Sequence, residues 1–301
     1  MRFAGDCQGL GFRAGWLSLR RTLHVVPGKV LAMRNFHRCS ILGLILIRPL
    51  VSWAEPSPES FAAFDRYAQQ LEQRLAGQHS KAGSFLYFQQ PREAAMARLL
   101  AGESVIEGDG SPRELPGALL HHWRGSLYVP GAKAEDFLRI MQDYDHLASR
   151  FQPQVLSARL LERRGEDFKI AMRVRQHHIL TVVLDTGYLV HYGELDAAHG
   201  YSASRSTQVW EIAGAGTKHE HALDVGSGHG YLYRINTYWS YAETSGGLLL
   251  QCESITLTRD VPRGLGWAVT PFIQSIPRES LEFTLDGLRR ALEGRPKHDS
   301  R

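Results

Sequence analysis

Charged side chains interrupt three otherwise apolar segments of this 301-residue chain, and they are the first candidates for chemistry. Arg234 and Glu253 lie in two successive segments of alternating pattern, and Arg173 lies between Met172 and Val174 in an earlier one. A carboxyl group beside a guanidinium can act as an acid–base pair, and a few such groups in an apolar cavity can orient a ligand. The plainer interpretation is that Arg234 and Glu253 pair across a sheet or extend to water.

Histidines supply the other candidate chemistry. One cluster holds metal-ligand residue types: His219, Glu220, His221, Asp224 and His229. The glycines around that cluster predict a solvated loop rather than a fixed metal site. His121 and His122 would point to opposite faces of a strand, as would His177 and His178, so neither pair can share a metal ion. The segment 226–230 is rich in glycine but precedes a strand pattern, so it predicts a turn rather than a phosphate loop. We expect no metal and no cofactor.

The elements that must position these residues follow from hydrophobic periodicity. Helices are expected at 59–76, 91–101, about 133–147 and about 277–292, the last with Pro277 in its first turn. Strands are expected at 119–129, 154–163, 167–176, 179–193, 201–213, 229–242 and 247–258, with a glycine-, proline- and acid-rich connection at about 102–118. Because no long helix separates the later strands, the sheet should be antiparallel.

The order strand, helix, six strands and long helix is informative, because a curved sheet has one concave face that the final helix would cover. Here the sequence resembles the START-like superfamily of helix-grip proteins, over about 119–293. Local similarity lies in His122–Gly131, Asp143–His146 and Leu257–Trp267. The resemblance implies an α+β helix-grip fold, with a curved antiparallel sheet of about seven strands wrapped on the C-terminal helix. Residues 55–118 would form a helical extension.

The same resemblance implies a lipid or isoprenoid-like ligand in an apolar cavity under the final helix. The residues expected to line it are Arg173, Tyr188, Arg234, Tyr238, Trp239, Glu253, Trp267 and Phe272. A second hypothesis is a cyclase- or isomerase-like enzyme that uses Glu253 as acid or base, with Arg234 stabilising charge. A third is a scaffold with a filled core that binds a protein partner through 55–118. Segment 264–273 would be either a flexible entrance to the cavity or a hydrophobic wrap.

The distribution of charge and the pattern of the N-terminal residues indicate the class of partner and the localisation to expect. Residues 1–54 carry eight Lys and Arg and one acid, whereas the rest holds 27 basic and 30 acidic residues, which argues against a nucleic-acid partner. Residues 33–54 show a basic start, an apolar run and Ser52-Trp53-Ala54, typical of a signal peptide after an over-long start at 1–32. Export is therefore expected, with transient membrane contact at most; an organellar transit peptide is the alternative. Cys252 should be a buried thiol, and 294–301 a disordered tail.

Overall fold

The computed structural model describes residues 56–110, 112–177, 181–225, 227–228, 231–260 and 266–294, although the side chains of 266–274 are outside this description. The chain divides into two compact units, residues 1–49 and 50–301, and every described residue belongs to the second. The expected leader and residues 295–301 of the expected tail lie outside the described residues.

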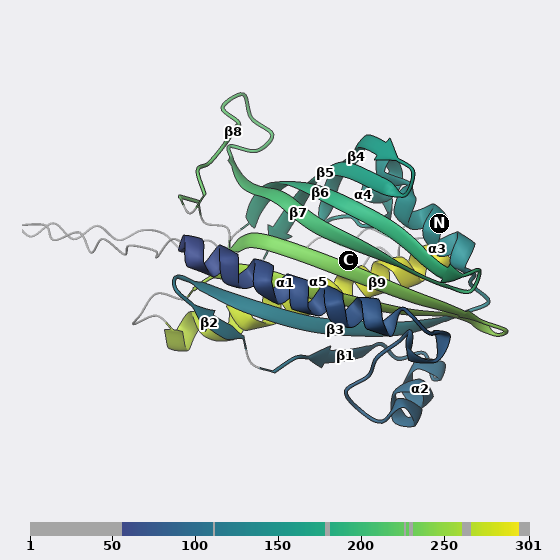
Figure 1. Ribbon diagram of the computed structural model, residues 1–301. Coiled ribbons are helices and arrows are strands. Elements are labelled where there is room, and N and C mark those ends of the chain that lie inside the picture. The colour runs from purple at the N-terminus through teal and green to yellow at the C-terminus, as the bar shows by residue number, and fades with distance from the viewer. Residues whose placement is uncertain are drawn as a thin grey trace, which may run out of the picture. The chain divides into compact units, whose positions relative to one another are not determined.

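An antiparallel sheet occupies the centre of the second unit (Figure 1). Its strands are β1 (Val105–Gly108), β2 (Arg113–Leu115), β3 (Ala118–Pro130), β4 (Val155–Arg164), β5 (Asp167–His177), β6 (Thr181–Asp196), β7 (His199–Ala213), β8 (His221–Ala222), β9 (Leu232–Thr244) and β10 (Gly247–Arg259). The strand order is β1-β3-β10-β9-β7-β6-β5-β4, with β2 paired to β3 and β8 paired to β7.

Helices cover both faces of this sheet (Figure 1). They are α1 (Pro58–Gln78), α2 (Arg92–Leu100), α3 (Ala134–Gln142), α4 (Leu147–Arg150) and α5 (Gly266–Leu292), with short 3-10 turns at Ala82–Ser84 and Tyr144–His146. Helix α1 packs on one face, called here the α1 face, and α5 packs on the other, called the α5 face.

Helix α1 begins at a well-defined cap and buries one apolar stripe. The side chain of Ser57 accepts a hydrogen bond from the Ser60 amide at 3.2 Å, and Pro58 occupies the first turn. The stripe repeats at helical spacing and packs against strands β3, β9 and β10. Its buried members are Phe64, Ala68, Leu71 and Leu75.

Helix α5 lies close to the middle of β3 because that strand has a glycine there. A Cβ atom on Gly125 would approach Leu285 to 2.5 Å and Leu281 to 3.1 Å, so any larger residue would push the helix away. Further along α5, Arg289 donates to the Ser104 hydroxyl at 3.1 Å. The N-terminal half of α5 therefore runs toward the other end of β3, the end that begins at Ala118.

The α+β helix-grip arrangement expected from the sequence is confirmed, and each of the seven expected strands is present. The strand number is higher, because β1, β2 and β8 are additional. The prediction that 102–118 is only a connection was therefore partly wrong, because β1 and β2 form there by pairing with the free edge of β3. The final helix begins at Gly266 rather than Pro277, so the segment from 266 to 273 is helical backbone.

Candidate functional site

The α5 face is filled with large apolar side chains at the end nearest α3. Leu127 and Val129 of β3 and Leu248 and Leu250 of β10 are fully buried there, beneath Leu285. Rings fill the remaining space in two groups: Phe137 with Trp239 and Tyr241, and Phe168 with Tyr144 and Tyr192. This end of the face is a packed core, in which the hydroxyls of Tyr144 and Tyr192 are hydrogen bonded to each other at 3.0 Å.

The same face becomes polar toward the other end of β3 and β10. Ser254, Thr256 and Thr258 follow the apolar residues of β10 at alternate positions, and His121 lies opposite Thr256 in the register. All four are buried, with His121 only 1% and Thr256 5% exposed. His121 Nε2 and Thr258 Oγ1 are hydrogen bonded at 2.9 Å. We call these four residues the polar end of the α5 face.

Two buried polar atoms at the polar end have no hydrogen-bond partner in the described part of the chain. They are Nδ1 of His121 and Oγ1 of Thr256. A buried polar atom without a partner costs about 1–3 kcal/mol, so such atoms are rare in folded proteins unless water or a ligand serves them. The polar end is therefore the strongest candidate site on this face.

Burial keeps the His121 imidazole neutral. Removal from water lowers the pKa of His121 from its usual 6.5 to about 4. The N-terminal half of α5, which runs toward this end, has no ionisable residue in its sequence from Gly266 to Gln274. The polar end thus offers hydrogen bonds without a formal charge near neutral pH.

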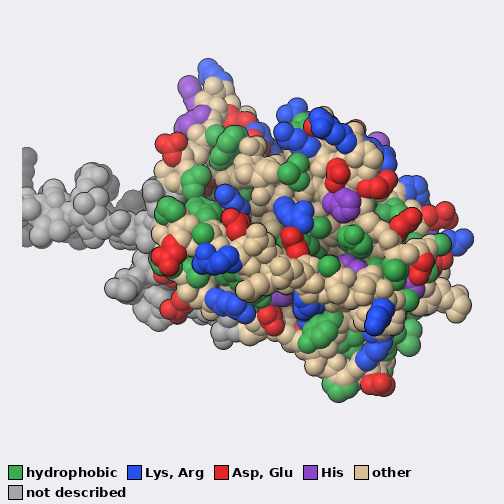
Figure 2. All heavy atoms as spheres, viewed as in Figure 1, with side chains coloured by type: hydrophobic (Ala, Val, Ile, Leu, Met, Phe, Trp, Pro, Cys, Tyr) green, Lys and Arg blue, Asp and Glu red, His purple; other side chains and the backbone are tan. Residues whose placement is uncertain are grey.

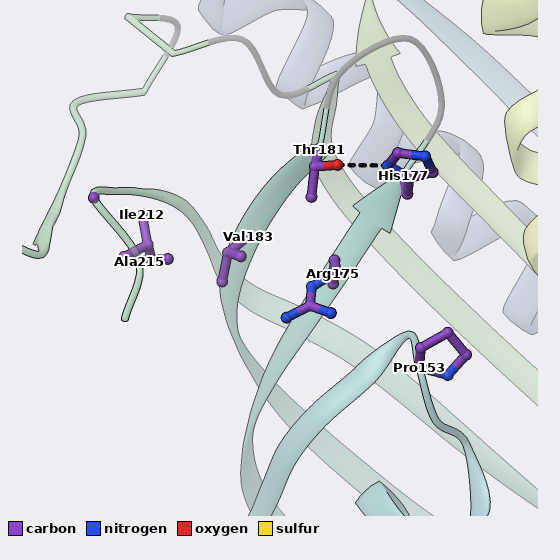
Figure 3. A pocket seen from close by; sticks show the side chains of 8 residues that line it. Pro153, Arg175, His177, Thr181, Val183, Ile212 and Ala215 are labelled. Atoms are coloured by element: carbon purple, nitrogen blue, oxygen red, sulfur yellow. Dashed lines mark hydrogen bonds between the residues drawn. The ribbon is translucent and has the colours of Figure 1, made fainter. Parts of the chain in front are cut away.

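Two hollows lie near the β5–β6 hairpin. One of about 650 Å³ is lined by Pro153, Arg175, His177, Thr181, Val183, Ile212, Gly214 and Ala215. Figure 3 shows Arg175 and His177 on β5, with His177 Nδ1 hydrogen bonded to Thr181 Oγ1 at 2.5 Å. The second, of about 240 Å³, shares Arg175 and is also bordered by Gln176 and by Ser280 of α5. This second hollow therefore opens between α5 and the sheet.

Two of the expected site residues lie on the α5 face. Trp239 is buried, with its ring 5.6 Å from that of Phe137, and Tyr188 packs against the same core. Burial raises the pKa of the Tyr188 hydroxyl. Trp267 and Phe272 belong to the backbone of α5, but their side chains lie outside the described residues.

Three others point away from α5, which corrects the expectation that they line a cavity under that helix. Tyr238 packs beneath α1, and its hydroxyl donates to Glu72 Oε1 at 2.9 Å. Arg234 stacks on Phe61 of α1, 4.7 Å from the ring centre. Glu253 bonds to Arg74 of the same helix. The physical reason is that helices cover both faces of the sheet. Apolar neighbours in the sequence therefore could not show whether a side chain faces α5 or α1.

Arg234 and Glu253 also do not pair with each other. In the register between β9 and β10, Glu253 lies opposite Tyr238, whereas Arg234 lies opposite Leu257. The guanidinium of Arg234 instead donates to the Tyr233 carbonyl at 3.0 Å. Neither the expected cross-strand pair nor the alternative acid–base pair is formed.

Glu253 is the centre of a buried ion cluster under α1. Its Oε2 accepts from Arg74 at 2.5 Å, from His122 at 2.9 Å and from Arg124 at 3.0 Å. Burial alone would raise the pKa of Glu253, but the His122 hydrogen bond and the two arginine charges outweigh it and hold the pKa well below its usual range. Tyr67 of α1 also bonds to His122 at 2.8 Å. A carboxylate held in this way fastens α1 to the sheet and is poorly suited to proton transfer.

Arg173 is used in a different ion network, away from the α5 face. It binds both oxygens of Asp185, at 2.6 and 2.8 Å, and Glu220 at 2.8 Å. Glu220 comes from the loop in which a metal cluster was considered, while His221 is exposed and His229 lies outside the described residues. Among the residues that the structure describes, no group of three or more His, Cys, Asp or Glu could hold a metal ion.

Two further observations concern single residues and helices. Cys252 is buried and free, as expected, and burial raises the pKa of its thiol. Within the described part of the chain, none of the helices combines the length and the apolar character needed to cross a membrane.

Sequence reasoning missed the polar end of the α5 face. The alternation of β3 did place His121 and His122 on opposite faces, and this is confirmed: His121 bonds to Thr258, whereas His122 bonds to Glu253. A usable signal was the change along one face of β10 from Leu248, Leu250 and Cys252 to hydroxyl residues. That change marks the point at which the buried face of β10 is no longer part of the apolar core.

No protein-family model matches the chain, and the comparison with curated proteins gives no match either. Among solved structures, it is similar to a STAR-related lipid transfer protein from Xanthomonas axonopodis, with 16% identity over 61% of this chain and 98% of that one, at a TM-score of 0.39. It is also similar to the Zhui aromatase/cyclase from Streptomyces sp. R1128, with 14% identity over 60% and 98% of the two chains, at a TM-score of 0.40.

A START superfamily protein from Mycobacterium smegmatis is similar to the same extent, with 15% identity over 57% of this chain and 97% of that one, at a TM-score of 0.40. Such low identities and TM-scores leave the ligand and the activity to be argued from this chain's own residues. Its element order and topology, an antiparallel sheet that grips a long C-terminal helix, are those of the START-like, helix-grip fold.

Proposed function

We propose that this protein binds a hydrophobic small molecule between the sheet and the N-terminal half of α5. The observation that carries the proposal is the polar end of the α5 face, where His121 Nδ1 and Thr256 Oγ1 are buried without a partner in the described chain. A mostly apolar pocket with a few convergent polar groups is the usual form of a small-molecule site.

The surroundings of the polar end support the same proposal. Apolar residues flank it on the same face, including Leu184 of β6 and Val209 of β7. The smaller hollow is bordered by Ser280 of α5 and Gln176 of β5, so it lies between this helix and one end of the sheet. Burial of apolar surface contributes about 25 cal/mol per Å², so a few hundred Å² of ligand surface gives moderate affinity.

The cyclase- or isomerase-like alternative loses its expected machinery. Glu253 and Arg234 face α1 and are not in contact, and Glu253 is engaged by three cationic or imidazole groups. The neighbours named as lipid transfer and aromatase/cyclase proteins are compatible with either function on this fold. We therefore propose binding or transport, with a lipid or isoprenoid-like molecule as the ligand class.

The test is native mass spectrometry of the full chain after incubation with a total bacterial lipid extract, followed by solvent extraction of bound molecules. We expect one apolar molecule per chain. Ser254→Phe should fill the polar end and abolish binding, whereas Ser157→Phe, at an exposed position of β4, should leave it unchanged. Thermal unfolding of each variant checks that it is folded.

An apo mass for the folded wild-type chain, across extracts from several sources, would contradict the proposal. Equal binding by the folded Ser254→Phe variant would also contradict it, because the ligand would then lie elsewhere.

A further inference from the structure

The hydrogen bonds at the polar end of the α5 face determine which atoms are left for a ligand. The Thr258 hydroxyl donates to the Leu119 carbonyl oxygen, at a long 3.5 Å. With its proton directed there, the Thr258 oxygen accepts the hydrogen bond from His121 Nε2, at 2.9 Å. This arrangement assigns the Nε2–H tautomer to His121, and the remaining ring nitrogen, Nδ1, is then a hydrogen-bond acceptor.

Thr256 offers the complementary group beside it. Its hydroxyl has no partner in the described chain and can donate one hydrogen bond. Thr256 lies directly opposite His121 in the β3–β10 register, so the two Cβ atoms are about 4.5–5.5 Å apart. One small group with both a donor and an acceptor can therefore reach both side chains.

We propose that the ligand is a neutral apolar alcohol, whose hydroxyl group donates to His121 Nδ1 and accepts from Thr256 Oγ1–H. This inference rests on the proposed function and names the chemical class of its ligand. A hydroxyl satisfies both partnerless atoms at once, whereas an ether oxygen accepts but cannot donate to Nδ1.

Charge at the site argues against an anionic headgroup such as a carboxylate or phosphate. Burial keeps His121 neutral near pH 7, as its pKa of about 4 implies. The arginines expected at the site lie elsewhere: Arg234 under α1, and Arg173 in its network with Asp185 and Glu220. Among the described side chains, a buried anion would thus meet no counter-charge at the polar end and would pay a large desolvation cost.

The experiment compares three probes of equal chain length with the full-length protein: decanol, its methyl ether and decanoate. Affinities are measured by displacement of an environment-sensitive naphthylamine dye. We expect decanol to bind about tenfold more tightly than the ether, because the ether leaves Nδ1 unpaired. Thr256→Val should weaken the binding of both decanol and the ether about fivefold, because each ligand oxygen accepts from the Thr256 hydroxyl.

Thr207→Val, the same substitution at an exposed strand position, is the control and should change neither affinity. As a direct reading of the contact, the ¹⁵N chemical shift of His121 Nδ1 should move when decanol binds and stay unchanged with the ether. Equal wild-type affinities for decanol and ether, or tightest binding of decanoate, would overturn the alcohol assignment alone. Failure of all three probes to bind would overturn the proposed function as well.

Discussion

Two buried polar residues on neighbouring strands illustrate different ways of satisfying a polar group away from water. Glu253 is 1% exposed and shares one oxygen among Arg74, His122 and Arg124. His121 is equally buried but has one partner, Thr258, within the described chain. Three contacts to Oε2 favour a structural role for Glu253, although its Oε1 has no hydrogen-bond partner in the described chain. Among the described residues, no ion pair accounts for the burial of His121, and its partnerless Nδ1 favours a role in binding.

Neutralising Glu253 should destabilise the protein. Glu253→Gln leaves the cations of Arg74 and Arg124 next to an uncharged amide, and we expect the free energy of unfolding to fall by about 3 kcal/mol, at the low end for a broken buried pair because Arg74 is partly exposed. Urea denaturation measures the change. Asp65→Asn, an exposed change on α1, should stay within about 0.5 kcal/mol. A loss below about 1 kcal/mol for Glu253→Gln would refute the structural role.

Stability should also fall between about pH 6.5 and pH 4 because of His121. Its pKa is about 4 in the folded protein and 6.5 when unfolded, so the unfolded state binds more protons in this window. The contribution is complete above pH 6.5 and is lost as the pH falls toward 4. Between pH 6.5 and pH 4, the free energy of unfolding of His121→Gln should fall by about 1–3 kcal/mol less than that of the wild type. Parallel curves for the variant and the wild type would contradict this assignment.

At the scale of elements, the sequence predicted strand and helix positions better than the direction in which strand faces point. Runs of β-prone residues bounded by glycine and proline locate the seven main strands within a few residues. The face toward α5 could not be chosen, because α1 makes the opposite face of β9 and β10 equally buried. Glycine and proline between 264 and 277 obscured the first half of α5, although Pro271 and Pro277 lie within that helix.

Helix α1 should contribute to stability as part of the sheet's covering layer. Leu71 is 5% exposed between α1 and the sheet, whereas Leu100, at the end of α2, is 61% exposed. We expect Leu71→Ala to lower the unfolding free energy by about 2–5 kcal/mol, because it leaves a cavity. The matched variant Leu100→Ala should cost less than about 0.5 kcal/mol. Equal costs in chemical denaturation would show that α1 is only loosely docked.

At the scale of the whole folded unit, the sheet is a middle layer between two helical layers. The α1 face carries the Glu253 ion cluster, which fastens α1 to the sheet. The α5 face carries the aromatic core and the polar end. Charges of both signs are interspersed over the surface on the α1 side (Figure 2), without a single-sign patch there that would favour nucleic acid. The apolar stripe of α1 is already used within the fold, which weakens the hypothesis that 55–118 acts mainly by binding another protein.

The most direct test of the account is photo-crosslinking of the full chain with a diazirine-bearing long-chain alcohol, followed by peptide mapping. The account predicts labelling of residues 118–123 of β3, 254–258 of β10 and the N-terminal half of α5, with competition by unlabelled decanol. Labelling concentrated on α1 would contradict a ligand site between the sheet and α5.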